Sequence, residues 1–295
     1  MVDLKARDAV STLRPSNAPV AKIQGGGESK GGVHMDTLRS LEEEGKDPRL
    51  SPELGARRSF RWPVQLALLN DYLYVAAAGS HQIWRADPYT FDLSPLLGCG
   101  ECAVRSRTDP NYSDLSSQSA FASPTGIVAL PGKLLVSEAE SSTIREIDFR
   151  QREAPLSTLL GNDRLFSRDL SAFGDADGYA RSVRLQCPMA LAGLSASSAL
   201  LADTYNHKVK VLQAPSGSTP GDPAAAASVS RLAGSGKRGY RDGAGAEAEF
   251  DEPRGLCVDG KGGQAFVCDS NNHCIRTVDL RTGEVGTLKI KEKGV

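Results

Sequence analysis

An internal repeat limits the possible folds of this chain more than any other feature of its sequence. The segments YVAAAGSHQIWRAD (74–87), LVSEAESSTIREID (135–148), LLADTYNHKVKVLQ (200–213) and FVCDSNNHCIRTVD (266–279) align without gaps. A proline precedes each of them, and these prolines stand 61, 64 and 65 residues apart, at Pro63, Pro124, Pro188 and Pro253. Such a period predicts one supersecondary unit that is repeated along the chain.

Each repeat reads as four short strands. In the second unit, strands are predicted at 126–131, 133–139, 143–149 and 156–160, with turn residues between them and no convincing helix. Four-stranded sheets packed face to face around an axis make a β-propeller, whereas a sandwich or a β-solenoid is the alternative. We therefore predict an all-β propeller with four complete four-stranded blades within residues 59–295.

The beginning of the chain resembles the end of its last repeat. Residues 1–13 (MVDLKARDAVSTL) match TVDLRTGEVGTL at 277–288, so they are predicted to be terminal strands of a preceding blade. Residues 14–58 are predicted to be a flexible insertion with a short helix at 34–48. Either the chain is a C-terminal piece of a longer protein, which we favour, or these strands complete another blade.

Two columns of the repeat carry charges of opposite sign. If a tight turn joins the second and third strands, these columns face each other across a hairpin. The predicted pairs are Glu138 with Arg145, Asp203 with Lys210, and Asp269 with Arg276, while Ala77 and Trp84 take both places in the first repeat. Surface pairs of this kind contribute about 0.2–1 kcal/mol each, so we interpret them as blade fasteners rather than catalysts.

A third column contains histidine in three of the four repeats. It consists of His81, Ser142, His207 and His273. A metal ion needs ligands that converge on one point, which equivalent positions on different blades achieve only at the axis. We therefore predict a structural role for this column in the turn.

Other short motifs are ambiguous. Cys99 and Cys102 form a C-x-x-C, a weak candidate for redox chemistry because the pair lies in a turn-rich interval. DADG (175–178) resembles part of a calcium loop, but Asp177 and Asp242 both stand eleven residues before a repeat proline. A turn built on Asp-Gly explains both aspartates, and no metal or other cofactor is predicted.

Composition excludes several classes of partner. The 35 Lys and Arg residues balance 36 Asp and Glu residues, which gives no electrostatic reason to expect nucleic acid. No apolar run approaches the roughly 20 residues that cross a bilayer, so membrane insertion is not expected. Six cysteines are too sparse for a disulfide scaffold, and no secretory signal is visible, which leaves cytoplasm or chloroplast open.

ADTYNHKVKVL and CDSNNHCIRTVDL resemble NHL repeats. AFGDADG and SEAESSTIREIDF add similarity to NHL-repeat proteins that place a thioredoxin-like domain ahead of a six-bladed propeller, including the plant SUPPRESSOR OF QUENCHING proteins of chloroplasts. The resemblance implies a propeller that binds a protein partner or a sibling domain. The thioredoxin-like segment itself is not recognised here, so its chemistry cannot be assigned to Cys99 and Cys102.

Two classes of function remain for this sequence. The first is a non-catalytic interaction scaffold, because propellers carry function in loops on a rigid ring. The alternative is a metal-dependent lyase or lactonase-like hydrolase with its site over the central channel. For that enzyme, Glu138, Asp203 and Asp269 form the one candidate ligand ring, yet each has a predicted basic partner.

Overall fold

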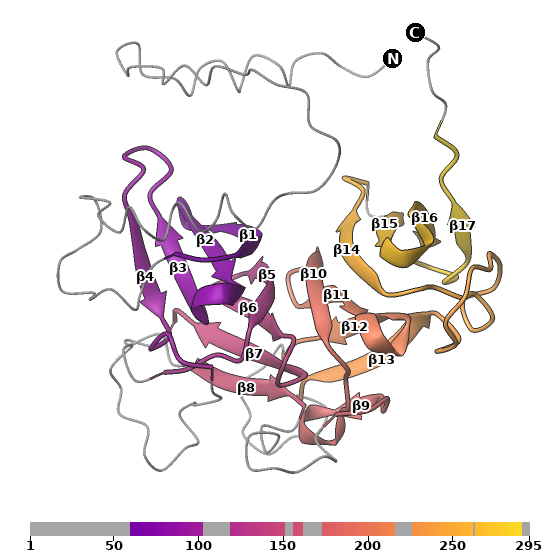
Figure 1. Cartoon of the computed structure of the whole chain (residues 1–295), viewed down its shortest axis with the longest axis horizontal. Coiled ribbons are helices and arrows are strands. Elements are labelled where there is room, and N and C mark those ends of the chain that lie inside the picture. The colour runs from indigo at the N-terminus through magenta and orange to yellow at the C-terminus, as the bar shows by residue number, and fades with distance from the viewer. Residues whose placement is uncertain are drawn as a thin grey trace, which may run out of the picture.

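The fold is a β-propeller arc of four sheets (Figure 1). The computed structural model describes residues 60–102, 119–150, 156–161, 173–215, 226–261 and 263–290. Each sheet corresponds to one sequence repeat, which confirms the prediction of four four-stranded blades. The predicted terminal strands (1–13) and the whole predicted insertion (14–58), with its short helix, lie outside the described residues, so they stay predictions.

The strands follow one another in simple antiparallel order within each blade. Blade 1 contains β1 (Pro63–Leu69), β2 (Tyr72–Ala77), β3 (Gln82–Ala86) and β4 (Leu93–Leu97). Blade 2 contains β5 (Pro124–Leu130), β6 (Lys133–Glu138), β7 (Thr143–Asp148) and β8 (Leu156–Leu160). Blade 3 contains β10 (Pro188–Ser195), β11 (Ser198–Asp203), β12 (Lys208–Gln213) and β13 (Ser228–Ala233). Blade 4 contains β14 (Pro253–Val258), β15 (Gln264–Asp269), β16 (Cys274–Asp279) and β17 (Val285–Thr287).

Blade 3 has a fifth strand that the repeat pattern does not predict. The short strand β9 (Gly178–Tyr179) belongs to the segment that leads into blade 3, and it pairs with the outer edge of β13 through Ser228 and Val229. β9 can add to the sheet there because an outermost strand leaves backbone N–H and C=O groups free to pair with a neighbouring segment.

Apolar side chains on both faces of the sheets hold the blades together. One cluster joins blades 1 and 2 and includes Ile83, Leu97, Ile127 and Val136. Equivalent clusters join blades 2 and 3, and blades 3 and 4. Strands that bury both faces carry apolar residues without strict alternation, which is the pattern found in the sequence. The stacking therefore follows directly from the repeat.

The first strands of the four blades, β1, β5, β10 and β14, are the innermost, and consecutive ones lie side by side. The side chain of Gln65 in β1 reaches across this centre to two other blades. Its Nε2 donates to the carbonyl of Leu191 (2.6 Å), and its Oε1 accepts from the backbone N–H of Ile127 (3.2 Å). Blades 1 and 4 lie at opposite ends of the arc (Figure 1).

Candidate functional site

In every blade a tight turn joins the second strand to the third and ends in a residue with positive φ. That residue is the one in the histidine column, with φ of 51° at His81, 55° at Ser142, 53° at His207 and 52° at His273. In three blades the turn is a short 3-10 helix, at η1 (Ala78–Ser80), η4 (Thr204–Asn206) and η6 (Ser270–Asn272). The turn aligns the two strands so that the acidic and basic columns meet.

The structure brings all three predicted charge pairs together. The shortest distances are 3.0 Å from Glu138 Oε1 to Arg145 Nη1, 2.9 Å from Asp203 Oδ2 to Lys210 Nζ, and 2.7 Å from Asp269 Oδ2 to Arg276 Nη1. All six side chains are completely buried, unlike the surface pairs assumed from the sequence. Removal of one partner from such a pair is therefore expected to cost far more than a surface pair contributes.

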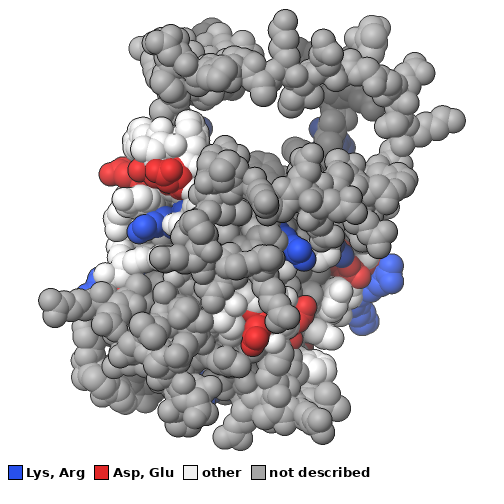
Figure 2. Space-filling view, turned by 60° about the vertical axis from the view of Figure 1, so that its left-hand side comes forward, with Lys and Arg blue, Asp and Glu red and all other residues white. Residues whose placement is uncertain are grey.

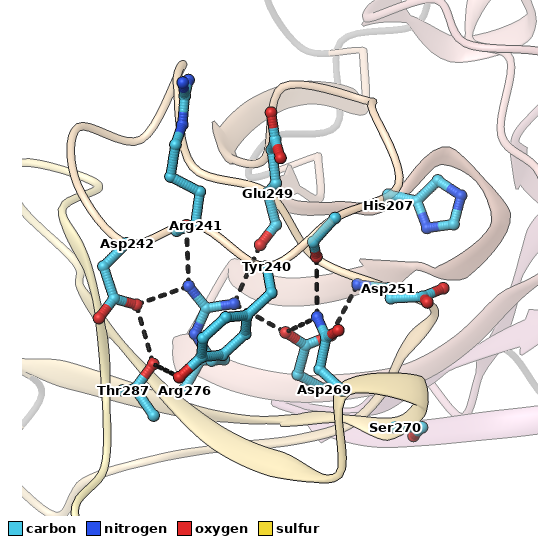
Figure 3. Close-up of polar contacts among 12 residues, drawn as sticks. His207, Tyr240, Arg241, Asp242, Glu249, Asp251, Asp269, Ser270, Arg276 and Thr287 are labelled. Carbon is cyan, nitrogen blue, oxygen red and sulfur yellow. Dashed lines mark hydrogen bonds and ion pairs between the residues drawn. The ribbon is translucent and has the colours of Figure 1, made fainter.

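In blade 4 the buried cation also holds the segment that enters the blade (Figure 3). Arg276 Nη2 donates to Asp242 Oδ1 at 2.6 Å and to the carbonyl of Arg241 at 2.9 Å. Its Nη1 donates to the carbonyl of Glu249 at 2.9 Å. The guanidinium also lies against two rings, with its central carbon 5.0 Å from the centre of Tyr240 and 5.1 Å from that of Phe250. Arg276 thus anchors the whole connection between blades 3 and 4.

In blade 3, Lys210 anchors the segment that enters the blade in the same way. Its Nζ lies 3.0 Å from Asp175 Oδ1 and 3.1 Å from Asp177 Oδ1, in addition to Asp203. Burial by itself disfavours the charged ammonium, but the carboxylates of Asp203, Asp175 and Asp177 outweigh it and raise the pKa of Lys210. Asp175 and Asp177 of the DADG stretch are therefore counter-ions for the buried ammonium of Lys210. The equal spacing of Asp177 and Asp242 before their prolines was the sequence signal for this role.

Blades 2 and 1 vary the same arrangement. In blade 2 the guanidinium of Arg145 donates to the carbonyl of Ala120 (3.4 Å) and lies over Phe121 (5.7 Å). In blade 1 the completely buried Trp84 replaces the cation, packs edge-on against Phe60 (5.3 Å), and donates from Nε1 to Gln82 Oε1 (3.1 Å). An apolar contact thus takes the place of an ion pair.

The histidine column forms a second recurrent contact, which we name the latch. Its side chain accepts a hydrogen bond from the N–H of the residue before the next blade's proline. The three latches are Ser123 N to His81 Nδ1, Cys187 N to Ser142 Oγ, and Glu252 N to His207 Nδ1, each 3.1 Å long. The three donors share positive φ, at 59°, 51° and 50°. Each latch therefore joins one blade to the next.

A model of the NHL repeat matches residues 250–277, the part of the chain that contains the blade 4 pair and its entering segment. The chain is 35% identical over 236 residues to SUPPRESSOR OF QUENCHING 1 of Arabidopsis thaliana, a match that covers 78% of this chain and 20% of that protein. This chain is an NHL-repeat β-propeller. It is 32% identical over 231 residues to human NHL repeat-containing protein 2, covering 75% of this chain and 30% of that protein.

The match with this chain thus spans about a fifth to three tenths of the length of these relatives. A crystal structure of a protein of unknown function from Bacteroides thetaiotaomicron is also similar, with a TM-score of 0.52 and 17% identity. The match covers 72% of this chain and 46% of that one, and it concerns the fold alone. Within the described residues there is no helix long and apolar enough to span a membrane.

The cysteine pair of this NHL propeller lies in the segment after β4. Cys99 is partly exposed and Cys102 exposed, and Cys102 Sγ donates to Glu140 Oε2 at 2.7 Å. Partial burial and the neighbouring carboxylate of Glu140 raise the pKa of Cys102 to about 12. The thiolate is the reactive form of cysteine, so this environment opposes redox chemistry. Across the described ranges, no three His, Cys, Asp or Glu side chains form a group that could hold a metal ion.

We predict that Cys102 reacts slowly with iodoacetamide at pH 8. Its rate should be lower by about tenfold or more than that of Cys257 and Cys268, which are exposed cysteines of the same chain. Peptide mass spectrometry after timed alkylation measures all three rates in one sample. Equal rates would contradict the prediction, and Glu140→Gln is expected to accelerate the reaction of Cys102.

A second prediction concerns Asp242. Partial burial alone raises the pKa of this carboxyl, but hydrogen bonds from Arg276 and Thr287 outweigh it and lower the pKa below its usual range. A depressed carboxyl pKa stabilises the folded state above about pH 3.9 and ceases to do so as the pH falls through the folded-state value. Asp242→Asn should therefore lower the unfolding free energy at pH 7, with a difference from wild type that shrinks below pH 4.

Urea unfolding at pH 7, 5 and 3 tests this pH dependence. The exposed Asp92 of blade 1 provides the matched control, since Asp92→Asn removes a carboxylate that no buried cation contacts in the described structure. A deficit for Asp242→Asn of the same size at every pH would show that the loss is not electrostatic.

Proposed function

We propose that this NHL propeller is a non-catalytic scaffold that binds a protein partner, within a protein related to the thioredoxin-like NHL proteins. The three buried cations are each matched by at least one carboxylate, so this network supports a rigid frame rather than an acid–base site. The latches add a second set of contacts at the same end of the blades. Function then depends on side chains that this frame holds at the surface.

The observation that carries the proposal is the pair of exposed tyrosines at the latch end. Tyr205 lies in the η4 turn and is 48% exposed, and Tyr240 covers Arg276 yet is 59% exposed. Exposed Arg238 belongs to the same connection as Tyr240, and its ion pair with Asp251 holds it in place. Tyrosine and arginine on a rigid support are the residues that most often dominate protein–protein binding energy.

The visible charge distribution agrees with a protein partner. On the face in Figure 2, the described Lys and Arg side chains and the Asp and Glu side chains stand in small, separate groups. Binding to a phosphate backbone depends on a concentration of basic side chains that neutralises several phosphates. The described part of this face shows no such concentration of basic side chains.

A comparative pull-down tests the scaffold function. The double variant Tyr205→Ala and Tyr240→Ala is compared with wild type and with Tyr89→Ala, which removes a 67% exposed tyrosine from the turn between β3 and β4. At least one protein recovered from native extract should fall by about tenfold or more with the double variant and remain unchanged with Tyr89→Ala. Identical recovery with all three baits would overturn the proposal.

The alternative is a metal-dependent propeller enzyme. Its candidate ligands Glu138, Asp203 and Asp269 are each bound to a buried cation, which leaves them poor metal ligands. Metal analysis of the purified protein separates the two functions. Calcium or zinc at one ion per chain after extensive dialysis would favour the enzyme, and substoichiometric metal would favour the scaffold.

A further inference from the structure

The turn between β3 and β4 projects from blade 1 (Figure 1) and is closed by a set of hydrogen bonds. Asp87 Oδ1 accepts from the backbone N–H groups of Tyr89 (2.8 Å) and Thr90 (3.1 Å). The N–H of Phe91 donates to the carbonyl of Asp87 at 2.8 Å, and the N–H of Asp87 donates to the carbonyl of Asp92 at 2.9 Å. These contacts define the backbone of the whole turn.

Blade 4 contains the same turn between β16 and β17. Asp279 Oδ1 accepts from the backbone N–H groups of Arg281 (2.9 Å) and Thr282 (2.7 Å). The N–H of Gly283 donates to the carbonyl of Asp279 at 2.8 Å, and the N–H of Asp279 donates to the carbonyl of Glu284 at 2.9 Å. Because the two turns share one hydrogen-bond pattern, their side chains can be compared position by position.

One position of this shared turn has a left-handed backbone. Gly283 occupies it in blade 4 with φ of 74°, whereas Phe91 occupies it in blade 1 with φ of 63°. Glycine adopts this conformation readily, but a residue with a Cβ atom is strained there. Burial does not offset the strain in blade 1, because the side chain of Phe91 is 70% exposed. An exposed aromatic residue on strained backbone indicates a function other than stability.

The side chains around Phe91 make this end of blade 1 both apolar and acidic. Tyr89 is 67% exposed, so one short turn presents two aromatic rings to solvent. Asp92 is exposed, and the exposed Asp71 lies in the turn between β1 and β2, at the same end of the sheet. Among the described residues of blade 1, Arg85 is the one cation near this end, and it stacks on a tyrosine ring at 4.7 Å. Exposed aromatic rings are thus combined with an excess of carboxylates.

We propose that the turn at 87–92 is a docking element that inserts into an apolar pocket rimmed by lysine or arginine on a partner protein. The rings of Tyr89 and Phe91 fill the pocket, and the carboxylates of Asp71 and Asp92 face its basic rim. Aromatic anchors in a pocket dominate the binding energy of such contacts, whereas complementary rim charges speed association. The same carboxylates would be repelled by an anionic membrane surface, so charge favours the protein partner.

Site-specific photocrosslinking in the cells that make this protein tests the proposal. The photoreactive amino acid benzoylphenylalanine replaces Tyr89 in the full chain, and the matched control position is Arg281, the counterpart of Tyr89 in blade 4. Mass spectrometry identifies the crosslinked peptides. We expect a protein crosslink at several times the control yield, in a peptide that contains lysine or arginine beside apolar residues. In lysate, its yield should fall severalfold between about 0.05 M and about 0.5 M salt, because salt screens the rim charges.

The variant Phe91→Gly separates binding from stability. It places at this position the residue that blade 4 uses, so the midpoint of urea unfolding should equal or exceed that of wild type. In the Tyr89 photoprobe, the same variant should nevertheless lower the crosslink yield severalfold, because one of the two aromatic anchors is missing.

A yield no higher than at Arg281, a crosslink that salt does not weaken, or a crosslink to lipid would overturn the proposal. So would a lower unfolding midpoint for Phe91→Gly, since Phe91 would then serve the fold. The turn and the latches lie at opposite ends of β3 and its counterparts, so Tyr205→Ala with Tyr240→Ala should not change the crosslink. Tyr89→Ala likewise leaves the latch end intact, and either hypothesis can fail without the other.

Discussion

Replacement of Arg276 by alanine is expected to lower the free energy of unfolding by about 3–5 kcal/mol. The variant leaves the Asp269 carboxylate completely buried without its cation. It also removes three further hydrogen bonds that hold Arg241, Asp242 and Glu249. Urea unfolding followed by circular dichroism measures the loss.

Two further variants identify the origin of this loss of stability. Arg276→Lys keeps the charge but cannot bond Asp269, Asp242 and two carbonyls in one plane, so its stability should lie between those of wild type and Arg276→Ala. Arg254→Ala is the matched control, because Arg254 forms a surface pair with Glu252 and its side chain is 49% exposed. Arg254→Ala should lower the free energy of unfolding by less than about 1 kcal/mol. A loss for Arg276→Ala within that range would contradict the structural role of the network.

Lys210→Met should destabilise the protein by about 3–5 kcal/mol, more than Asp203→Asn does. The asymmetry follows from the contacts. Without Lys210, the buried carboxylate of Asp203 loses the one cation that it pairs with among the described residues, whereas without the charge of Asp203 the ammonium of Lys210 still contacts Asp175 and Asp177. Asp203→Asn should therefore cost about 1–3 kcal/mol, the range for an impaired buried hydrogen bond.

A double-mutant cycle of Asp203→Asn and Lys210→Met measures the coupling between the two side chains. Chemical denaturation of the four proteins supplies the cycle. We expect a coupling energy above about 1 kcal/mol, beyond the range of exposed pairs. Zero coupling, or equal losses for the two single variants, would show that the pair is not the fastener that its burial indicates.

The repeat predicted the four blades because a propeller blade is a local unit. The four strands of each blade are adjacent in sequence, so turn residues and apolar spacing along about 40 residues are sufficient to define them, whereas the extra strand β9 of blade 3 comes from the preceding segment. The meeting of Asp269 with Arg276 was predictable for the same reason, since one hairpin connects them. The substitution of Ala77 and Trp84 in blade 1 also pointed to a paired function of the two columns.

The relations between blades were decided by the tertiary structure. The pair of Asp203 and Lys210 lies on the sheet face that packs against blade 2, since Lys210 stands opposite Leu201, and Asp175 approaches Lys210 from 35 residues earlier in the chain. The latch from His207 to Glu252 spans 45 residues and joins two sheets. Such contacts form only once the blades have stacked. Burial then makes the loss of one partner of a charge pair within a hairpin far more costly than the loss of a surface ion pair. Sequence alone thus determined each blade, whereas stacking determined how its charged and latch residues act.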